Sequence, residues 1–417
     1  MTGSQPRGAA ADTGDEARQR SLERRILFWM CVLIAVNQLG FGAIIPTLPL
    51  YAQSFGVSAS AIGLAIAVYG LARFAAALPA GNVADRFGRR PALALGGFVS
   101  ALGNIWCAVA VGYPEFIVAR FVAGLGAGIV LTVGQVVLAD ISTPERRGRM
   151  ISIYQGTFIF AVGIGPLPGG LLAEYVSLAA PFWAYGIAAF GACAVAWFAV
   201  EETRDFSDTS GAASAGPPPP FSTQLRLMTA QIGFLLVSLV SLMNAVVRTG
   251  GLFNIVPVLA TATLGISVAQ IGFALAVGSV SGLLAAYPAG WLTDRFGRKA
   301  VIVPATVLAG ASMLLFGLAP SYPWFLAAAV VWGVAISAGG SAPAAYAADS
   351  APPRMNAAAM STFRMVGDLG YVIGPIALGL IVDLHGAMTG LVVGAGLLVA
   401  VGLLFLAFAP ETYRRGR

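Results

Sequence analysis

Apolar segments of about 20 residues recur along the whole chain, and each is long enough to cross the hydrocarbon core of a membrane as a helix. Charged residues make up only 10% of the chain, so it has too few polar side chains to cover a water-facing surface. A helix satisfies its own backbone hydrogen bonds in lipid. We predict an all-α membrane protein with twelve transmembrane helices, at residues 26–50, 60–83, 92–112, 115–139, 149–175, 180–200, 229–258, 268–291, 300–318, 322–347, 357–382 and 387–409.

The basic residues lie almost entirely on alternate connections between these spans. Of the 24 Lys and Arg residues, all but four fall in the two termini or in every second loop, and the four lie inside spans. Because Lys and Arg concentrate on the cytoplasmic side, we expect a multi-pass protein of the plasma (inner) membrane with both termini in the cytoplasm. The Lys and Arg residues lie in short clusters between apolar segments. A nucleic-acid-binding protein needs them on one face with interleaved aromatic residues, so we expect no nucleic-acid partner.

Composition divides the chain into five parts. The polar first segment predicts a short disordered tail, and a Pro-rich, Ser-rich stretch in the middle predicts a flexible linker. The expected parts are a cytoplasmic tail at 1–25, a six-helix bundle at 26–200, a cytoplasmic linker at 201–228, a second six-helix bundle at 229–410 and a cytoplasmic tail at 411–417.

An internal repeat relates the two halves at a constant offset of 209 residues. The sequence AGNVADRFGRR at 80–90 returns as AGWLTDRFGRK at 289–299, and the same offset links Gly165-Pro166 to Gly374-Pro375. A constant offset without a gap indicates duplication. Parallel halves related by a pseudo-two-fold axis are typical of transporters, with the site between the halves near the membrane midplane. We therefore expect a transporter and not an enzyme.

The repeated loops resemble the signature of the major facilitator superfamily, G-x-x-x-D-R-x-G-R-[RK], and the resemblance extends from about residue 26 to 412. It implies two pseudo-two-fold-related six-helix bundles and transport by alternating access. The motif residues are Gly81, Asp85, Arg86, Gly88, Arg89 and Arg90 in the first copy, and Gly290, Asp294, Arg295, Gly297, Arg298 and Lys299 in the second.

The charges of these loops predict a latch between the halves. A carboxylate stabilises the positive N-terminus of a helix, so we expect Asp85 to contact the start of span 11, while Arg89 pairs with Asp140. These contacts would form only when the cytoplasmic side is closed, and the resemblance implies the same role. The alternative is a basic loop that only sets topology. The expected latch residues are Gly81, Asp85, Arg86, Arg89, Asp140, Gly290, Asp294 (facing the start of span 5), Arg295, Arg298 and Asp349, which is expected to pair with Arg298.

Two further motifs resemble those of the drug:proton antiporter branch of this superfamily. The G-P-x-x-G-G run that begins at Gly165 is similar to the core of the antiporter motif, although Ala161 stands where the longer pattern has Gly. The alternative is that these glycines serve only close helix packing. Arg120 opens an R-x-x-x-G-x-G-x-G run similar to one associated with proton transfer; alternatively, it holds a neighbouring helix through carbonyl groups. The expected kink residues are Gly165, Pro166, Gly169, Gly170, Gly374 and Pro375.

Five charged residues lie within spans and away from their ends, where each needs a partner or a polar cavity. Asp368 is the only carboxylate near the midplane, and Arg364 precedes it by one helical turn on the same face. We expect Asp368, Arg364 and Arg120 to carry proton coupling; a static Arg364–Asp368 pair is the alternative. The remaining two are Arg73 and Arg248.

The membrane arginines give the expected cavity a net positive charge. The resemblance implies proton-coupled export of small organic molecules or drugs, whereas the positive charge favours the alternative, uptake or exchange of an organic anion. We expect no cofactor and no metal site, and a monomer whose partners are a small-molecule substrate, protons and the lipid bilayer. The expected cavity residues are Asn37, Phe41, Arg73, Gln135, Tyr154, Gln155, Phe158, Asn244, Arg248, Asn254 and Tyr371.

Overall fold

The computed structural model describes residues 8–142, 144–204, 226–228, 230–351 and 356–412 of the 417-residue chain. These residues form helices and connecting turns, without a strand among them. The main elements are α1 (Gly8–Ile44), α2 (Leu48–Gln53), α3 (Ala59–Phe87), α4 (Arg89–Val109), α5 (Tyr113–Ile141), α6 (Pro144–Ile164), α7 (Pro166–Tyr175), α8 (Ala180–Phe198), α10 (Ile232–Val247), η2 (Arg248–Ile255), α11 (Val256–Leu264), α12 (Val268–Phe296), α13 (Lys299–Gly317), α14 (Tyr322–Asp349), α15 (Asn356–His385) and α16 (Ala387–Phe408).

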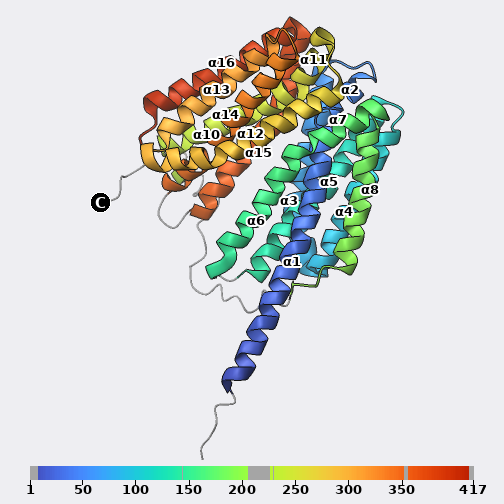
Figure 1. Cartoon of the computed structure of the whole chain (residues 1–417), viewed down its shortest axis with the longest axis vertical. Coiled ribbons are helices and arrows are strands. Elements are labelled where there is room, and N and C mark those ends of the chain that lie inside the picture. Colours follow the sequence, from blue (N-terminus) through green and yellow to red (C-terminus); the bar gives the residue numbers. More distant parts are fainter. Residues whose placement is uncertain (1–7, 143, 205–225, 229, 352–355, 413–417) are drawn as a thin grey trace, which may run out of the picture.

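The helices form two bundles, α1–α8 and α10–α16, which lie side by side (Figure 1). Within the described residues, twelve helical stretches are long and apolar enough to cross a membrane. The predicted fold class is therefore confirmed. Parts of the predicted tails and linker, residues 1–7, 205–225 and 413–417, lie outside the described residues.

The first helix departs from its predicted bounds at both ends. It begins at Gly8, so residues 8–25 continue the helix and the prediction of a disordered tail is wrong there. Ala, Arg, Glu and Gln fill most of that segment, and all four have high helix propensity. The helix stops at Ile44, and the separate helix α2 follows, because Pro46 cannot donate the backbone hydrogen bond that continuation requires.

Two later spans are broken into shorter helices. Span 5 divides into α6 and α7 at Gly165-Pro166, where the proline lacks the N–H group that would continue the helical hydrogen bonds. Span 11 continues as the single helix α15 through Pro375, so the matching pair in the second half does not break the helix. Span 7 contains the π-helix η2 between α10 and α11, which the sequence analysis did not predict. A π-helix is rare and is frequent at functional sites.

The two bundles meet through backbone at the end of the molecule remote from the repeated loops. We call the end with loops 80–90 and 289–299 the basic end, and the other the opposite end. A Cβ atom on Gly63 of α3 would clash with the carbonyl oxygen of Pro375 in α15, and one on Gly272 of α12 would clash with that of Pro166 in α7. The 209-residue offset relates these two contacts. Glycine is therefore required at both positions.

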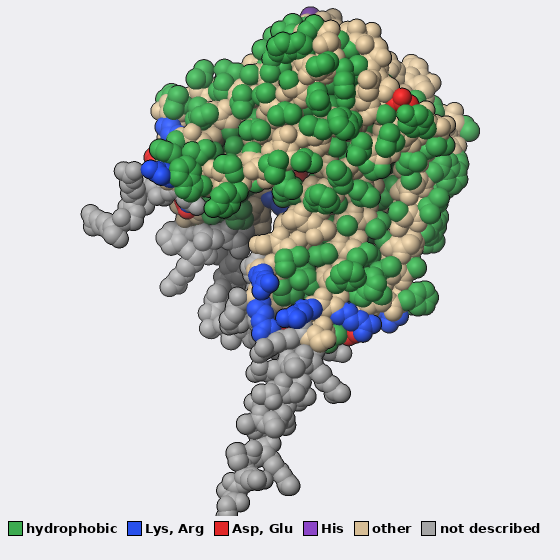
Figure 2. Space-filling view, viewed as in Figure 1, with side chains coloured by type: hydrophobic (Ala, Val, Ile, Leu, Met, Phe, Trp, Pro, Cys, Tyr) green, Lys and Arg blue, Asp and Glu red, His purple; other side chains and the backbone are tan. Residues whose placement is uncertain are grey.

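The bundles separate toward the basic end. On α6, a Cβ atom on Gly163 would lie 2.8 Å from the side chain of Ser279 in the other bundle, whereas Gly156, two turns nearer the basic end on the same face, has open space. On α3, the last such contact is between Gly70 and the ring of Tyr371. Figure 2 shows the surface hollowed between the bundles, above the row of Arg side chains at the basic end. The structure is thus closed at the opposite end and open at the basic end.

We predict that Gly63→Leu or Gly272→Leu opens the opposite end, because a side chain cannot fit between the touching backbones. The measurement is the distance between spin labels at Gln53 of α2 and Thr263 of α11 in a variant without native cysteines, and it should lengthen.

Gly396→Leu is the matched control, since a Cβ atom there meets nothing within 4 Å, and its label distance should stay unchanged. An unchanged distance in a correctly inserted Gly63→Leu variant would contradict the packing argument.

Candidate functional site

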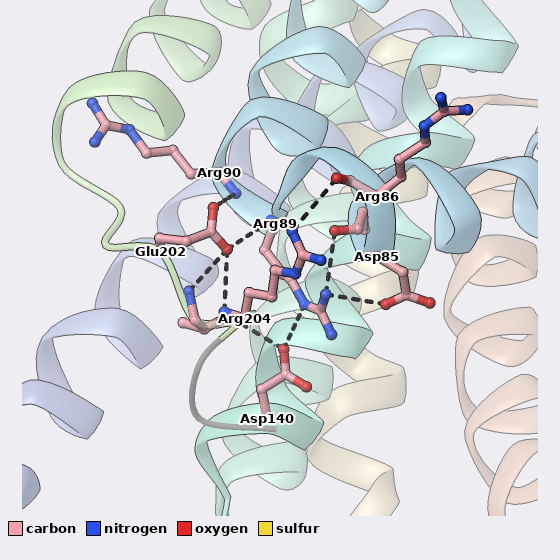
Figure 3. Close-up of polar contacts among 9 residues, drawn as sticks. Asp85, Arg86, Arg89, Arg90, Asp140, Glu202 and Arg204 are labelled. Atoms are coloured by element: carbon pink, nitrogen blue, oxygen red, sulfur yellow. Dashed lines mark hydrogen bonds and ion pairs between the residues drawn. The ribbon is translucent and has the colours of Figure 1, made fainter. Parts of the chain in front are cut away.

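The loop between α3 and α4 is held by a buried ion pair at the basic end (Figure 3). The Nε of Arg89 donates to Oδ2 of Asp140 at 2.8 Å, and both side chains are less than 10% exposed. The same guanidinium lies 3.0 Å from Oδ1 of Asp85 and donates to the carbonyl of Ala84. Because the Arg89–Asp140 contact is charge-assisted and largely desolvated, it fixes the end of α5 to the loop, as predicted.

Glu202, which lies in the predicted linker, completes this loop. Its carboxylate accepts hydrogen bonds from the backbone N–H groups of Arg89 at 2.8 Å and Arg90 at 3.2 Å, which caps the first turn of α4. Gly88 has φ +101°, and a Cβ atom there would clash with Glu202. The hydroxyl of Thr203 donates to Asp140. Residues 202–203 therefore belong to the first bundle, and the predicted linker begins too early.

The second bundle repeats this arrangement at the same offset. Arg298 donates to Asp349 at 3.3 Å, which confirms the predicted contact. Glu411 accepts from the backbone N–H groups of Arg298 and Lys299, and Thr412 donates to Asp349. An offset of 209 residues relates Glu202 to Glu411 and Thr203 to Thr412. Extending the repeat alignment from Pro166 to just beyond the end of the sixth span would have found both pairs.

The structure corrects the prediction that these pairs form only in a closed state. Arg89 and Asp140 belong to one bundle, as do Arg298 and Asp349, so neither pair depends on contact between bundles. Asp85 is 69% exposed and pairs with Arg89 of its own bundle, not with α15. The side chain of Asp294 lies outside the described residues.

The remaining predicted latch residues lie on the surface of their own loops. The guanidinium of Arg86 lies 5.4 Å from the ring centre of Phe87, and that of Arg295 lies 5.0 Å from the ring of Trp291. Gly81 and Gly290 face open space.

Aromatic rings and guanidinium groups from both bundles gather where α3 and α15 separate, at the closed end of the hollow. Phe41 of α1 stacks on Tyr69 of α3 at 5.5 Å and meets Tyr371 of α15 at 6.4 Å, which joins the bundles. The guanidinium of Arg73 lies 5.9 Å from the ring centre of Phe41, and that of Arg248 lies 5.8 Å from Tyr371. We call these five residues the central cluster. Tyr69 was not predicted.

The charges of the central cluster lack a counter-ion within the part of the chain that the structure describes. No carboxylate pairs with Arg73, Arg248 or the neighbouring Arg120 there. The Nε of Arg248 and the hydroxyl of Tyr371 are buried without a hydrogen-bond partner. Unpaired guanidinium groups and unsatisfied donors in an apolar setting are costly. The cluster is therefore suited to an acceptor or an anion.

Arg120 lies behind the cluster and is only 1% exposed. Its Nε donates to the carbonyl of Ala65 in α3 at 3.2 Å, and its guanidinium lies 4.3 Å from the ring centre of Tyr69. One nitrogen, Nη1, is buried without a partner. The contact with a neighbouring helix is the one expected under the structural alternative for this residue.

Asp368 and Arg364 extend the inter-bundle face of α15 toward the basic end. Their spacing from Tyr371 and Pro375 places all four on one side of the helix. Tyr371 and Pro375 contact α3, whereas Arg364 and Asp368 are exposed. No ion pair or hydrogen bond joins Arg364 to Asp368 within the described residues. Asp368 thus borders the hollow as a carboxylate without a fixed partner.

The other predicted cavity residues are dispersed. Asn37 borders a small cavity inside the first bundle, between α1, α4, α5 and α8. Asn254 donates to the carbonyl groups of Ala59 and Pro375, so it joins the bundles at the opposite end. Asn244 donates to a carbonyl of its own helix. Among the rest, Tyr154 is buried in the core of the first bundle, Gln155 and Phe158 are half-buried on α6, and Gln135 is exposed on α5.

At each glycine of the G-P-x-x-G-G run, a neighbouring helix lies where a side chain would otherwise be. A Cβ atom on Gly165 would lie 2.6 Å from the carbonyl oxygen of Leu39 in α1, and one on Gly169 would clash with that of Ala43. One on Gly170 would meet the carbonyl oxygen of Val268 in the other bundle. The run therefore lets α7 approach helices of both bundles.

Comparison with known proteins identifies the family. The chain is 24% identical over 384 residues to an uncharacterized MFS-type transporter of Methanocaldococcus jannaschii, covering 92% of this chain and 97% of that protein. It is 26% identical over 287 residues to the multidrug resistance protein MdtL of a Shewanella species, covering 68% of this chain and 70% of MdtL.

Solved structures share the fold at low identity. A bacterial homolog of the human lysosomal transporter Spinster, in its inward-facing and unoccupied conformation, superposes with a TM-score of 0.72 at 17% identity, over 93% of this chain and 95% of that one. The sequence profile of the Major Facilitator Superfamily matches residues 30–259 and, a second time, 237–417. The chain therefore belongs to the Major Facilitator Superfamily of transporters.

Proposed function

We propose that this protein exports small organic molecules across the plasma membrane in exchange for protons, by alternating access. The observation that carries this proposal is the hollow between the bundles, open at the basic end and bordered by the unpaired carboxylate of Asp368. Because Lys and Arg concentrate on the cytoplasmic side of a membrane protein, the basic end faces the cytoplasm in this proposal. The similarity to MdtL, a multidrug resistance protein, supports the choice of export.

In this proposal the substrate enters the hollow from the cytoplasm and binds against the central cluster. Asp368 binds a proton when the hollow opens to the outside and releases it when the hollow opens inward. Because proton binding and substrate binding oppose each other, downhill proton entry drives uphill export. The absence of a fixed ion pair at Asp368 supports this role, since a locked pair would hold the carboxylate deprotonated.

The repeated loops close the basic end in the other half of the cycle. Asp85 stands in the last turn of α3 and is exposed here. When the bundles come together at this end, its carboxylate meets the start of α15, where the free N–H groups and the helix dipole favour a negative charge. The buried Arg89–Asp140 pair keeps the loop rigid in both states.

A second candidate function is exchange of organic anions on the same fold, favoured by the uncompensated guanidinium groups of Arg73, Arg120 and Arg248. The stacked rings of Phe41 and Tyr69 suit a planar apolar group. Naphthalene-2-sulfonate and ethidium, an anion and a cation with planar rings, separate the two candidates in a vesicle transport assay.

We predict that Asp368→Asn abolishes substrate-driven proton flux in vesicles that contain the protein, because the amide cannot exchange a proton. The measurement follows an internal pH-sensitive dye after addition of ethidium or naphthalene-2-sulfonate. Asp368→Glu, which keeps the carboxyl group, should retain flux. Full proton flux in a correctly inserted Asp368→Asn variant would rule out this residue as the carrier.

We predict that Asp85→Asn increases the population open at the basic end, because the neutral amide interacts more weakly with the start of α15. A cysteine placed at Gln155 should then react faster with a water-soluble thiol reagent. Glu201→Gln is the control, since Glu201 pairs with Arg25 of the same bundle. Equal reaction rates in wild type and Asp85→Asn would argue against the latch.

If the anion candidate holds, Arg248→Gln weakens binding of naphthalene-2-sulfonate by about 10- to 100-fold, since a hydrogen bond to a charged group contributes about 1.5–3 kcal/mol. Arg248→Lys should lose less, because the charge remains. The exposed Arg24→Gln is the control. Equal affinity in Arg248→Gln, measured by calorimetry on the purified protein, would reject the anion candidate.

A further inference from the structure

Two carboxylates at the opposite end each join one bundle to the other. Asp383, in the last turn of α15, accepts hydrogen bonds from the backbone N–H of Ala59 through Oδ1 at 2.8 Å and from that of Ser60 through Oδ2 at 3.0 Å. Glu174, in the last turn of α7, accepts one from the backbone N–H of Ala269 through Oε2 at 2.9 Å. In both cases an acid at the end of one helix contacts the start of a helix in the other bundle.

The internal repeat relates the two contacts. The 209-residue offset that links the basic-end loops also links Glu174 to Asp383 and Ser60 to Ala269. The two acids differ in length, yet each contacts the second residue of the facing helix. The duplication therefore extends to a contact that exists only between the bundles.

The facing helices each receive their N-terminal hydrogen bonds from two sources. Ser58, the N-cap of α3, accepts from the N–H of Ala61, and Ser267, the N-cap of α12, accepts from that of Gln270. These side chains satisfy the third N–H group of each helix from within its own bundle. The first and second N–H groups of α3, and the second of α12, are left to the acids of the other bundle. These three N–H groups therefore have a protein acceptor only while the opposite end is closed.

The same pairs of spans, 2 with 11 and 5 with 8, are those expected to meet at the basic end. Asp383 of α15 caps the start of α3 in this structure, and Asp85 of α3 is proposed to cap the start of α15 in the other state. Glu174 of α7 caps the start of α12 in this structure. Asp294 lies in the last turn of α12, and in the other state it would cap the start of α6. Each pair runs antiparallel, so an end of one helix always lies beside a start of the other.

We propose that Glu174 and Asp383 are positioning residues that hold the opposite end closed, as the counterpart of the basic-end latch. This inference rests on alternating access as the proposed function. When the bundles rock apart at the opposite end, these hydrogen bonds break, and both carboxylates and the three backbone N–H groups are hydrated instead. The two acids therefore set how often that end opens.

The test measures the distance between spin labels at Gln53 and Thr263 in the full-length protein in lipid nanodiscs. Asp383→Asn and Glu174→Gln should each raise the ratio of long to short distances by about fivefold. The double variant should raise it by the product of the two, because the contacts are separate. Asp383→Glu and Glu174→Asp, which keep the charge, should shift it less.

Glu115→Gln is the matched control. Glu115 also lies at the opposite end and is partly exposed, but its carboxylate accepts from the backbone N–H of Val111 and from Trp106 within its own bundle, so the label distance should not change. Adding Asp85→Asn to Asp383→Asn should move the distances back toward wild type, which a merely unfolded variant would not do.

An unchanged distance distribution in the double variant, with normal insertion and elution, would overturn the proposal. The distance measurement needs neither substrate nor proton gradient. A failure of the proposed function, seen as absent transport in vesicles, is therefore distinguishable from a failure of this inference.

Discussion

The arrangement of the whole molecule depends on the backbone contacts between the bundles at the opposite end. Gly63 against Pro375 and Gly272 against Pro166 bring helices closer than any side chain would allow. The close approach places Asn254 within reach of carbonyl groups from both bundles. It also fixes where α3 and α15 begin to separate, and hence the depth of the hollow and the position of the central cluster at its closed end.

The central cluster concentrates positive charge where the membrane tolerates it least. Arg73 and Arg248 come from different bundles, so their separation changes whenever the bundles rock. Arg248 opens the π-helix η2, whose wider turn alters the direction of the side chains that follow. The unpaired donors are stable only with water or a bound acceptor. In the proposed cycle, substrate binding and bundle movement therefore act on the same few side chains.

Repetition in the sequence predicted the parts that both bundles share, because duplicated charges and glycines stand out against an apolar background. The Arg89–Asp140 pair and its Arg298–Asp349 copy follow from that pattern, whereas the twelve spans follow from the length of the apolar segments. Glu202 and Glu411 were missed because each follows the last apolar run of its half, where polarity resembles a linker. The π-helix was missed because it depends on packing and not on the period of apolar residues. Several predicted cavity residues lie elsewhere in the structure, because polarity alone does not tell which side of a helix a residue occupies.

The four acids at the ends of α3, α7, α12 and α15 each stand near the negative pole of their own helix, where a carboxylate is disfavoured. Asp383 and Glu174 each reach the positive pole of a helix in the other bundle. Asp85, which pairs with Arg89 here, and Asp294 are proposed to do so when the basic end closes. Two rigid bundles can touch at one end at a time, so in the proposed cycle two of the four acids contact a helix of the other bundle while the other two do not. The contacts between acids and helix N-termini that break when one end opens are replaced by equivalent contacts when the other end closes. The two states then differ little in free energy, and the binding of one proton or one substrate molecule is enough to decide between them.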